Sequence, residues 1–116
     1  MYTLWLRAVF GGLLIVAAVS GCRAEVAGGR DDGAAIFREV CARCHGADGA
    51  PPESMAKTLG VRDLSAAEFQ SGVSDEVLRA RIRDGSESRR MPAFEGVLTD
   101  SQIDAVAAYV RTLAKP

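Results

Sequence analysis

The sequence predicts an all-α protein made of short helices. Three observations support this prediction: apolar residues recur at helical spacing, helix-capping residues precede those segments, and no strand pattern or hairpin turn occurs. At 116 residues the chain forms at most one small domain. Its 48% apolar residues, 25% charged residues and formal net charge of −1 are ordinary for a globular protein and give no indication of nucleic-acid binding.

Residues 1–21 have the pattern of an export signal. Arg7 supplies a positive charge near the start, residues 9–19 form an apolar stretch, and the small residues Ser20 and Gly21 follow it. The stretch is shorter than the ~20 apolar residues that a membrane-spanning helix needs. We therefore predict that residues 1–21 are a signal peptide.

The end of this signal, Val19-Ser20-Gly21-Cys22, resembles the lipobox of bacterial lipoproteins. The resemblance implies cleavage before Cys22 and attachment of lipid to its thiol. An ordinary cleaved signal and an uncleaved anchor helix are the alternatives. All three place the protein outside the cytoplasm, and the lipoprotein interpretation places it on the periplasmic side of a bacterial envelope, bound to the membrane through lipid.

Residues 22–31 contain two glycines and no periodicity, so they are predicted to be a flexible tether from the lipidated Cys22. The folded domain is then predicted to span residues 32–116. Its first helix begins near Asp31 and Asp32, either of which can cap it. Packing residues and both thiols recur along one face of that helix at i, i+3, i+4 and i+7. This face carries Phe37, Val40, Cys41 and Cys44.

Three later segments read as helices, whereas residues 53–64 are weakly patterned and are predicted to be irregular or one short turn. A short helix starts near Ser65 and carries Phe69. A second runs from the Ser74 cap to Gly85. The last helix has the clearest start, because Thr99 and the glutamine three residues later have capping-box spacing. Its buried stripe is Ile103, Val106, Ala107, Val110 and Leu113.

The segment Cys41-Ala42-Arg43-Cys44-His45 is the strongest chemical signal in the chain. C-x-x-C-H is typical of covalent haem c attachment, in which Cys41 and Cys44 bind the macrocycle and His45 binds the iron. Zinc and dithiol chemistry are the alternatives. A zinc site needs four ligands, usually Cys or His. The chain has three cysteines and one histidine, and Cys22 is assigned to lipid, so only three ligands would remain. No strand precedes the motif as in thioredoxin-like proteins.

The second axial ligand is predicted to be Met91. His45 is the only histidine, so two histidines from one chain are excluded. Met55 follows the motif closely and is not expected to reach the other face of a haem. Met91 lies about 46 residues downstream, and Pro92 biases it toward an extended conformation from which the thioether can project. Without a haem, a lone methionine would be interpreted as core filler.

Residues 32–115 together resemble class I cytochrome c: a helix with C-x-x-C-H, short helices, a Met-Pro loop and an amphipathic last helix. The resemblance implies that the first and last helices cross, with Gly33, Phe37 and Tyr109 at the crossing. Two features of the family differ here. No proline is assigned to bind the proximal histidine through its carbonyl, and the tryptophan that binds a haem propionate in many members is missing.

The resemblance implies an electron carrier rather than an enzyme, a monomeric domain that works with redox partner proteins. Two alternatives remain: a haem domain whose Met91 dissociates to admit a small ligand, and a dedicated cytochrome subunit of a larger redox enzyme. Arginines cluster before Met91. They are interpreted either as a solvated helix face and loop, which we favour, or as a basic rim that attracts an acidic partner. They are Arg79, Arg81, Arg83, Arg89 and Arg90.

Overall fold

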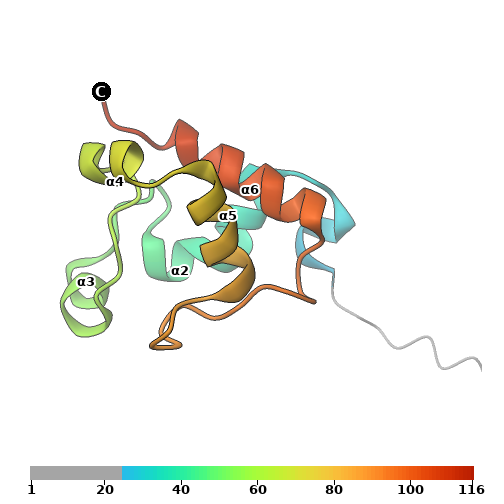
Figure 1. Cartoon of the computed structure of the whole chain (residues 1–116), viewed down its shortest axis with the longest axis horizontal. Helices are drawn as coiled ribbons and strands as arrows, with labels where there is room; N and C mark the ends of the chain where they lie inside the picture. Colours follow the sequence, from blue (N-terminus) through green and yellow to red (C-terminus); the bar gives the residue numbers. More distant parts are fainter. Residues whose placement is uncertain (1–24) are drawn as a thin grey trace, which may run out of the picture.

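A computed structural model of the chain describes residues 25–116, and this part is helical, without a β-sheet (Figure 1). The predicted signal peptide and Cys22 lie outside the described residues. The elements are η1 (Val26–Gly29), α1 (Gly33–Ile36), η2 (Phe37–Cys41), α2 (Ala42–His45), α3 (Glu53–Leu59), α4 (Ala67–Gly72), α5 (Asp75–Asp84) and α6 (Asp100–Thr112). No helix within residues 25–116 has the length and apolar character needed to cross a membrane.

The elements α1, η2 and α2 form one continuous helix over residues 33–45, here called the motif helix. The Asp32 carboxylate caps it by accepting from the Ala35 N–H at 3.0 Å. Within it, the Ala42 N–H donates to the Phe37 carbonyl five residues back, so η2 is a π-helical turn that ends at the first cysteine of the motif, Cys41. Such turns occur frequently at functional sites.

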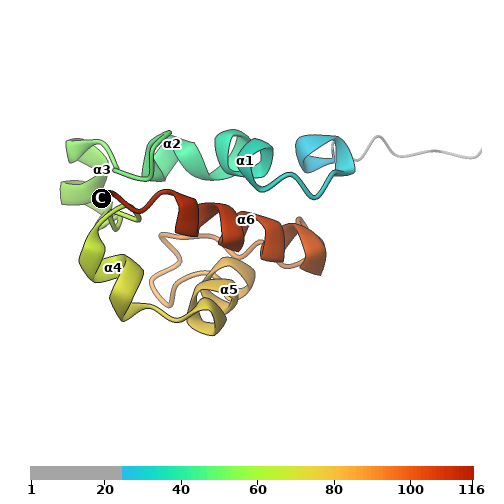
Figure 2. The same ribbon diagram turned by 90° about the horizontal axis from the view of Figure 1, so that it is seen from above.

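The motif helix and α5 lie on opposite sides of α6, which forms the centre of the fold (Figure 2). The capping box predicted at Thr99 begins α6. The helices approach so closely at Gly33 that a Cβ there would lie 2.1 Å from the Ala105 carbonyl oxygen. Nearby, the rings of Phe37 and Tyr109 stack at a tilt, with centroids 5.4 Å apart. The three residues expected at the helix crossing therefore meet there.

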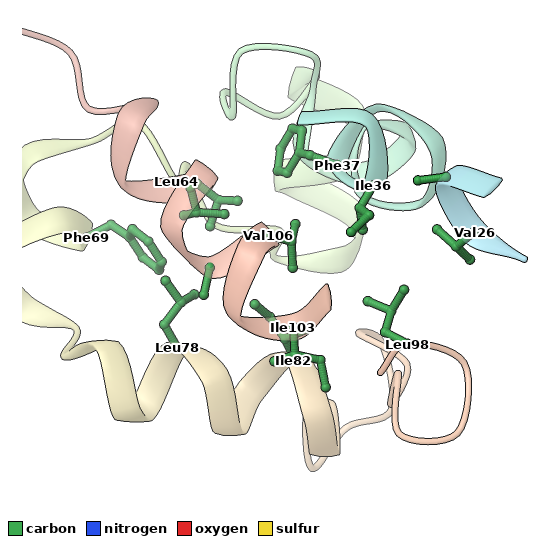
Figure 3. Packing of buried hydrophobic residues seen from close by; sticks show 13 residues of the cluster. Val26, Ile36, Phe37, Leu64, Phe69, Leu78, Ile82, Leu98, Ile103 and Val106 are labelled. Carbon is green, nitrogen blue, oxygen red and sulfur yellow. The ribbon is translucent and has the colours of Figure 1, made fainter. Parts of the chain in front are cut away.

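Buried apolar side chains from both neighbours line α6 and form the core (Figure 3). The most deeply buried are Ile36 and Phe37 of the motif helix and Ile103 and Val106 of α6. On the other side, α5 contributes its buried apolar stripe at helical spacing. Burial of these side chains supplies most of the driving force that holds the three helices together.

The structure differs from the sequence prediction in residues 53–64, where α3 forms two helical turns. Glu53 and Lys57 form an ion pair on its exposed surface, and Gly60 ends it in the left-handed conformation. None of its residues is fully buried. The apolar periodicity on which the prediction depended is therefore absent from this helix.

A second difference concerns residues 26–31, which pack onto the domain rather than forming a flexible tether. Val26 and Ala27 are buried. The Gln102 side-chain amide donates to the carbonyl oxygens of Val26 at 3.2 Å and Arg30 at 3.1 Å. The sequence does not show this contact because its two sides are about 75 residues apart. The folded domain therefore begins by residue 26.

Candidate haem site

A cavity of about 690 Å³ opens between the motif helix, residues 59–73, α5 and the segment that follows α5. Its size falls within the range of ligand and cofactor sites, which is about 300–1,000 Å³. Apolar side chains from every wall contribute to its lining, among them Val40, Leu64, Phe69, Leu78, Ile82 and Val106. This is the environment that a large apolar macrocycle requires.

The motif helix supplies the reactive groups of one wall. Cys41, Cys44 and His45 all line the cavity and are partly buried, and both thiols are free. Burial, with a smaller effect of the neighbouring Cys44, raises the pKa of the Cys41 thiol to about 12. Burial also lowers the pKa of His45, an effect opposed by its backbone hydrogen bond. The imidazole in this cavity is therefore biased toward its neutral, metal-binding form.

The His45 ring is oriented by a backbone carbonyl that the sequence did not identify. Its Nδ1 lies 3.2 Å from the Arg62 carbonyl oxygen, so Nδ1–H donates and Nε2 is left free to bind a metal. The Arg62 carbonyl thus makes the contact with the histidine for which no proline was assigned from the sequence. No side-chain pattern marks a carbonyl contact, so sequence analysis had no signal for it.

Met91 comes from a separate wall, the segment of residues 85–95 that we call the Met91 loop. The Ser86 N–H donates to the Met91 carbonyl at 3.0 Å, and the Met91 N–H donates to Ser86 Oγ at 3.1 Å. Gly85 allows this approach, because a Cβ there would lie 2.6 Å from the Met91 carbonyl oxygen. Met91 lines the cavity with the motif residues, whereas Met55 does not.

The donor set fits a haem better than a zinc ion. One imidazole, one thioether, two thiols and an apolar lining surround a single cavity, which suits covalent haem with His/Met ligation. Within residues 25–116, no cluster of three or more His, Cys, Asp or Glu side chains is placed to hold a metal ion. The zinc alternative therefore lacks its ligands in the described part of the chain.

Comparisons with known proteins agree with this chemistry. Residues 29–110 match the family described as cytochrome c oxidase, cbb3-type, subunit III. Cytochrome c6 of Bryopsis maxima is 38% identical over 78 residues, which cover 67% of this chain and 84% of the relative. Cytochrome c6 of Euglena gracilis is 34% identical over 82 residues, covering 71% and 90%. The solved structure of the KustC0563 c-type cytochrome has a TM-score of 0.66 and 33% identity, covering 72% of this chain and 99% of that chain.

Proposed function

This chain belongs to the class I cytochrome c family and carries covalently bound haem c, and we propose that Cys41 and Cys44 form the two thioether bonds while His45 and Met91 ligate the iron. It is an electron carrier rather than an enzyme. One observation supports the ligand assignment most strongly: two segments about 46 residues apart in sequence place the motif and Met91 in the walls of one cavity.

When bound, the haem supplies an iron that gains or loses a single electron. The chain's own residues keep the ligand set fixed during that change. The Arg62 carbonyl holds the His45 ring in the tautomer that leaves Nε2 free. Ser86 holds the Met91 backbone at two points: the Ser86 N–H donates to the Met91 carbonyl, and the Ser86 Oγ accepts from the Met91 N–H. With His45 and Met91 as its two ligands, the iron would have no open position for a substrate, and the thioether would favour the ferrous state.

The ligand assignment is tested by optical absorption of the holoprotein in both oxidation states and with carbon monoxide. The ferric protein is expected to be low-spin, with the weak far-red band of His/Met haem, and Met91→Ala is expected to lose that band. Met55→Ala, a matched control outside the cavity, is expected to keep it. A high-spin ferrous wild-type protein that binds carbon monoxide readily would instead establish the open-site alternative, in which Met91 dissociates.

We also propose that residues 1–21 are a signal peptide and that Cys22 is lipidated, so that the carrier works at the periplasmic surface of a bacterial membrane. The support is the signal pattern of residues 1–21 and the lipobox resemblance at Cys22. Membrane fractionation tests it. Wild-type protein is expected in the membrane fraction and Cys22→Ser in the soluble periplasmic fraction. Wild-type protein that is soluble after export would overturn the lipid anchor and leave the carrier function intact.

A second arrangement is favoured by one observation. The matching family is described as a subunit of a cbb3-type cytochrome c oxidase, so the domain could transfer electrons within a larger complex. Against this, the match covers 84% and 90% of two independent cytochromes c6, which indicates a carrier of similar size. Size-exclusion chromatography after mild detergent extraction separates the two: the carrier elutes alone, whereas a subunit elutes with its enzyme.

A further inference from the structure

We infer that Gln70, oriented by Arg111, is a positioning residue for His45 and thereby helps to set the reduction potential of the iron. This inference rests on the proposed function. Gln70 belongs to α4, which lies beside the C-terminal end of α6 (Figure 1). Gln70 is not among the residues that line the cavity, so its effect on the iron passes through the protein.

The backbone of residues 62–65 connects Gln70 to the histidine. The Arg62 carbonyl accepts from His45 Nδ1 at 3.2 Å, and two residues later the Leu64 carbonyl accepts from Gln70 Nε2 at 2.6 Å. Between them, the Leu64 N–H donates to the Gly49 carbonyl at 2.8 Å. Because peptide groups are planar, only a few backbone dihedrals separate the two carbonyls. A shift of the Leu64 carbonyl therefore displaces the Arg62 carbonyl as well.

The amide of Gln70 matches all the groups around it. Its Nε2 donates to the Leu64 carbonyl and also to the Val110 carbonyl of α6, at 3.0 Å. Its Oε1 accepts from the Arg111 guanidinium at 3.3 Å. A primary amide offers two N–H donors on one side and an acceptor oxygen on the other. A carboxylate here would face two carbonyl oxygens, and an apolar side chain would leave them without a donor.

Arg111 fixes which way this amide points. Its guanidinium also donates to the backbone carbonyls of Gln70 and Val73 and pairs with Asp75 at 2.8 Å. The Arg111 side chain is only 26% exposed, so these bonds form largely out of solvent. The rigid guanidinium fork thus presents a fixed donor to Oε1. This contact turns the Gln70 nitrogen toward the two carbonyl oxygens.

The direction of the expected effect on the potential follows from the histidine. A hydrogen bond from Nδ1–H to a carbonyl makes the ring a stronger electron donor to the iron and so favours the ferric state. Loss of the Gln70 amide should weaken that bond and raise the potential. General loosening acts in the opposite direction, because water that reaches the haem stabilises the extra positive charge of ferric iron. The sign therefore separates positioning from loosening.

The first test is a spectroelectrochemical titration of the holoprotein. Gln70→Leu keeps the charge and most of the side-chain volume but removes the amide. The Lys115 N–H still donates to the Ser65 carbonyl at 3.1 Å, so the segment is expected to stay in place and the holoprotein to form. At a fixed applied potential the ferrous-to-ferric ratio is expected to rise about threefold, a positive shift of ~28 mV for one electron. An unchanged or lowered potential would overturn the inference.

Gln102→Leu is the matched control. Gln102 makes the same three kinds of bond at the other end of α6: its Nε2 donates to the Val26 and Arg30 carbonyls, and its Oε1 accepts from the Thr99 N–H. It is also buried and does not line the cavity. Its loss is expected to lower stability at least as much as the loss of Gln70, yet to leave the potential at the wild-type value. Equal shifts in both variants would show that lost stability alone moves the potential, and would overturn the inference.

Hydrogen exchange, followed by NMR in the diamagnetic ferrous protein, tests the bond itself. The His45 Nδ1–H is expected to exchange about fivefold faster in Gln70→Leu and at the wild-type rate in Gln102→Leu. Wild-type protein alone gives a test that needs no variant to fold: the Gln70 side-chain protons are expected to be protected from exchange. Gln70 protons that exchange as fast as those of a free amide would overturn the inference.

The far-red band of the wild-type ferric protein reports separately on the proposed His/Met ligation. A protein that keeps this band but shows no effect of Gln70→Leu on the potential would overturn the positioning role alone. A protein without the band would instead overturn the ligand assignment. The two failures are therefore distinguishable.

Discussion

The motif helix and the Met91 loop both supply candidate iron ligands, but the fold holds them in different ways. The motif helix is fixed by side-chain packing: Gly33 lies against the α6 backbone, and Phe37, with no exposed surface, stacks on Tyr109. The Met91 loop is fixed by backbone hydrogen bonds and one serine hydroxyl, with Met91 itself only partly buried. Segments with few buried contacts open at lower free-energy cost. The haem attachment should therefore survive conditions that release Met91.

The largest effect is expected from removing the haem itself. Cys41→Ala/Cys44→Ala leaves a cavity of about 690 Å³ with an apolar lining in a domain too small to compensate for it. We expect the variant to be largely unfolded, without a cooperative transition in circular dichroism during urea titration. A sharp transition would show that the crossing of the motif helix and α6 is stable on its own, and would make the contrast between the two segments stronger still.

The next largest effect is expected at the helix crossing. In Gly33→Ala the new Cβ would lie 2.1 Å from the Ala105 carbonyl oxygen, so the motif helix and α6 must separate. Overpacking of this kind costs about 3 kcal/mol of unfolding free energy. Urea unfolding of the holoprotein measures it. Gly72→Ala is the matched control, because nothing lies within 4 Å of its Cβ. Equal stability of the two variants would refute the close crossing.

A smaller and more local effect is expected at Gly85, where φ is +75°. Gly85→Ala adds the strain of that conformation and a contact 2.6 Å from the Met91 carbonyl oxygen. Gly96→Ala is a matched control, because Gly96 has φ +77° and open space around its Cβ. Both variants carry a backbone cost of about 1 kcal/mol. Only Gly85→Ala is expected to lose the far-red band at neutral pH; if Gly96→Ala lost it equally, the Gly85 contact would not be what holds Met91.

The serine hydroxyl in the Met91 loop is expected to matter less. Ser86→Ala removes the acceptor of the Met91 N–H, a hydrogen bond worth about 1 kcal/mol. Imidazole, which competes with Met91, should therefore bind roughly fivefold more tightly. Titration with imidazole as a competing ligand measures this change. Ser86→Thr keeps the hydroxyl and is expected to keep the wild-type affinity. An unchanged imidazole affinity in Ser86→Ala would show that the Ser86 hydroxyl does not stabilise the position of Met91.

The same contrast explains what the sequence could and could not predict. The motif helix was predicted from local rules, since Phe37, Cys41 and Cys44 recur at helical spacing and Asp32 is a typical cap. For the Met91 loop, sequence analysis selected Met91 through Pro92, but its anchoring by Ser86 depends on backbone geometry that composition does not encode. The Arg62 carbonyl and the Gln102 contacts to residues 26–30 were missed for the same reason: each joins segments that are distant in sequence and uses a backbone oxygen.

The smallest effect is expected at the turn that follows Arg62. The Ser65 N–H and hydroxyl both donate to Asp63 Oδ1, at 2.9 Å and 2.5 Å, and hold the pKa of this carboxyl below its usual value of 3.8. A lowered pKa means that the stabilisation is present above about pH 3.8 and is lost as the pH falls through the folded pKa. Ser65→Ala should raise the Asp63 pKa toward 3.8, as measured by NMR titration of its side-chain carbon.

Stability at neutral pH should fall only slightly in Ser65→Ala, because solvent screens a partly exposed carboxylate. The absorption spectrum should not change, since the Leu64 N–H bond to the Gly49 carbonyl at 2.8 Å still holds the segment that carries the Arg62 carbonyl. An unchanged Asp63 pKa would refute the role of the hydroxyl. A changed haem spectrum would show that the orientation of His45 depends on one surface turn. The motif side of the cavity would then be as easily disturbed as the Met91 loop, and the contrast between the two would no longer hold.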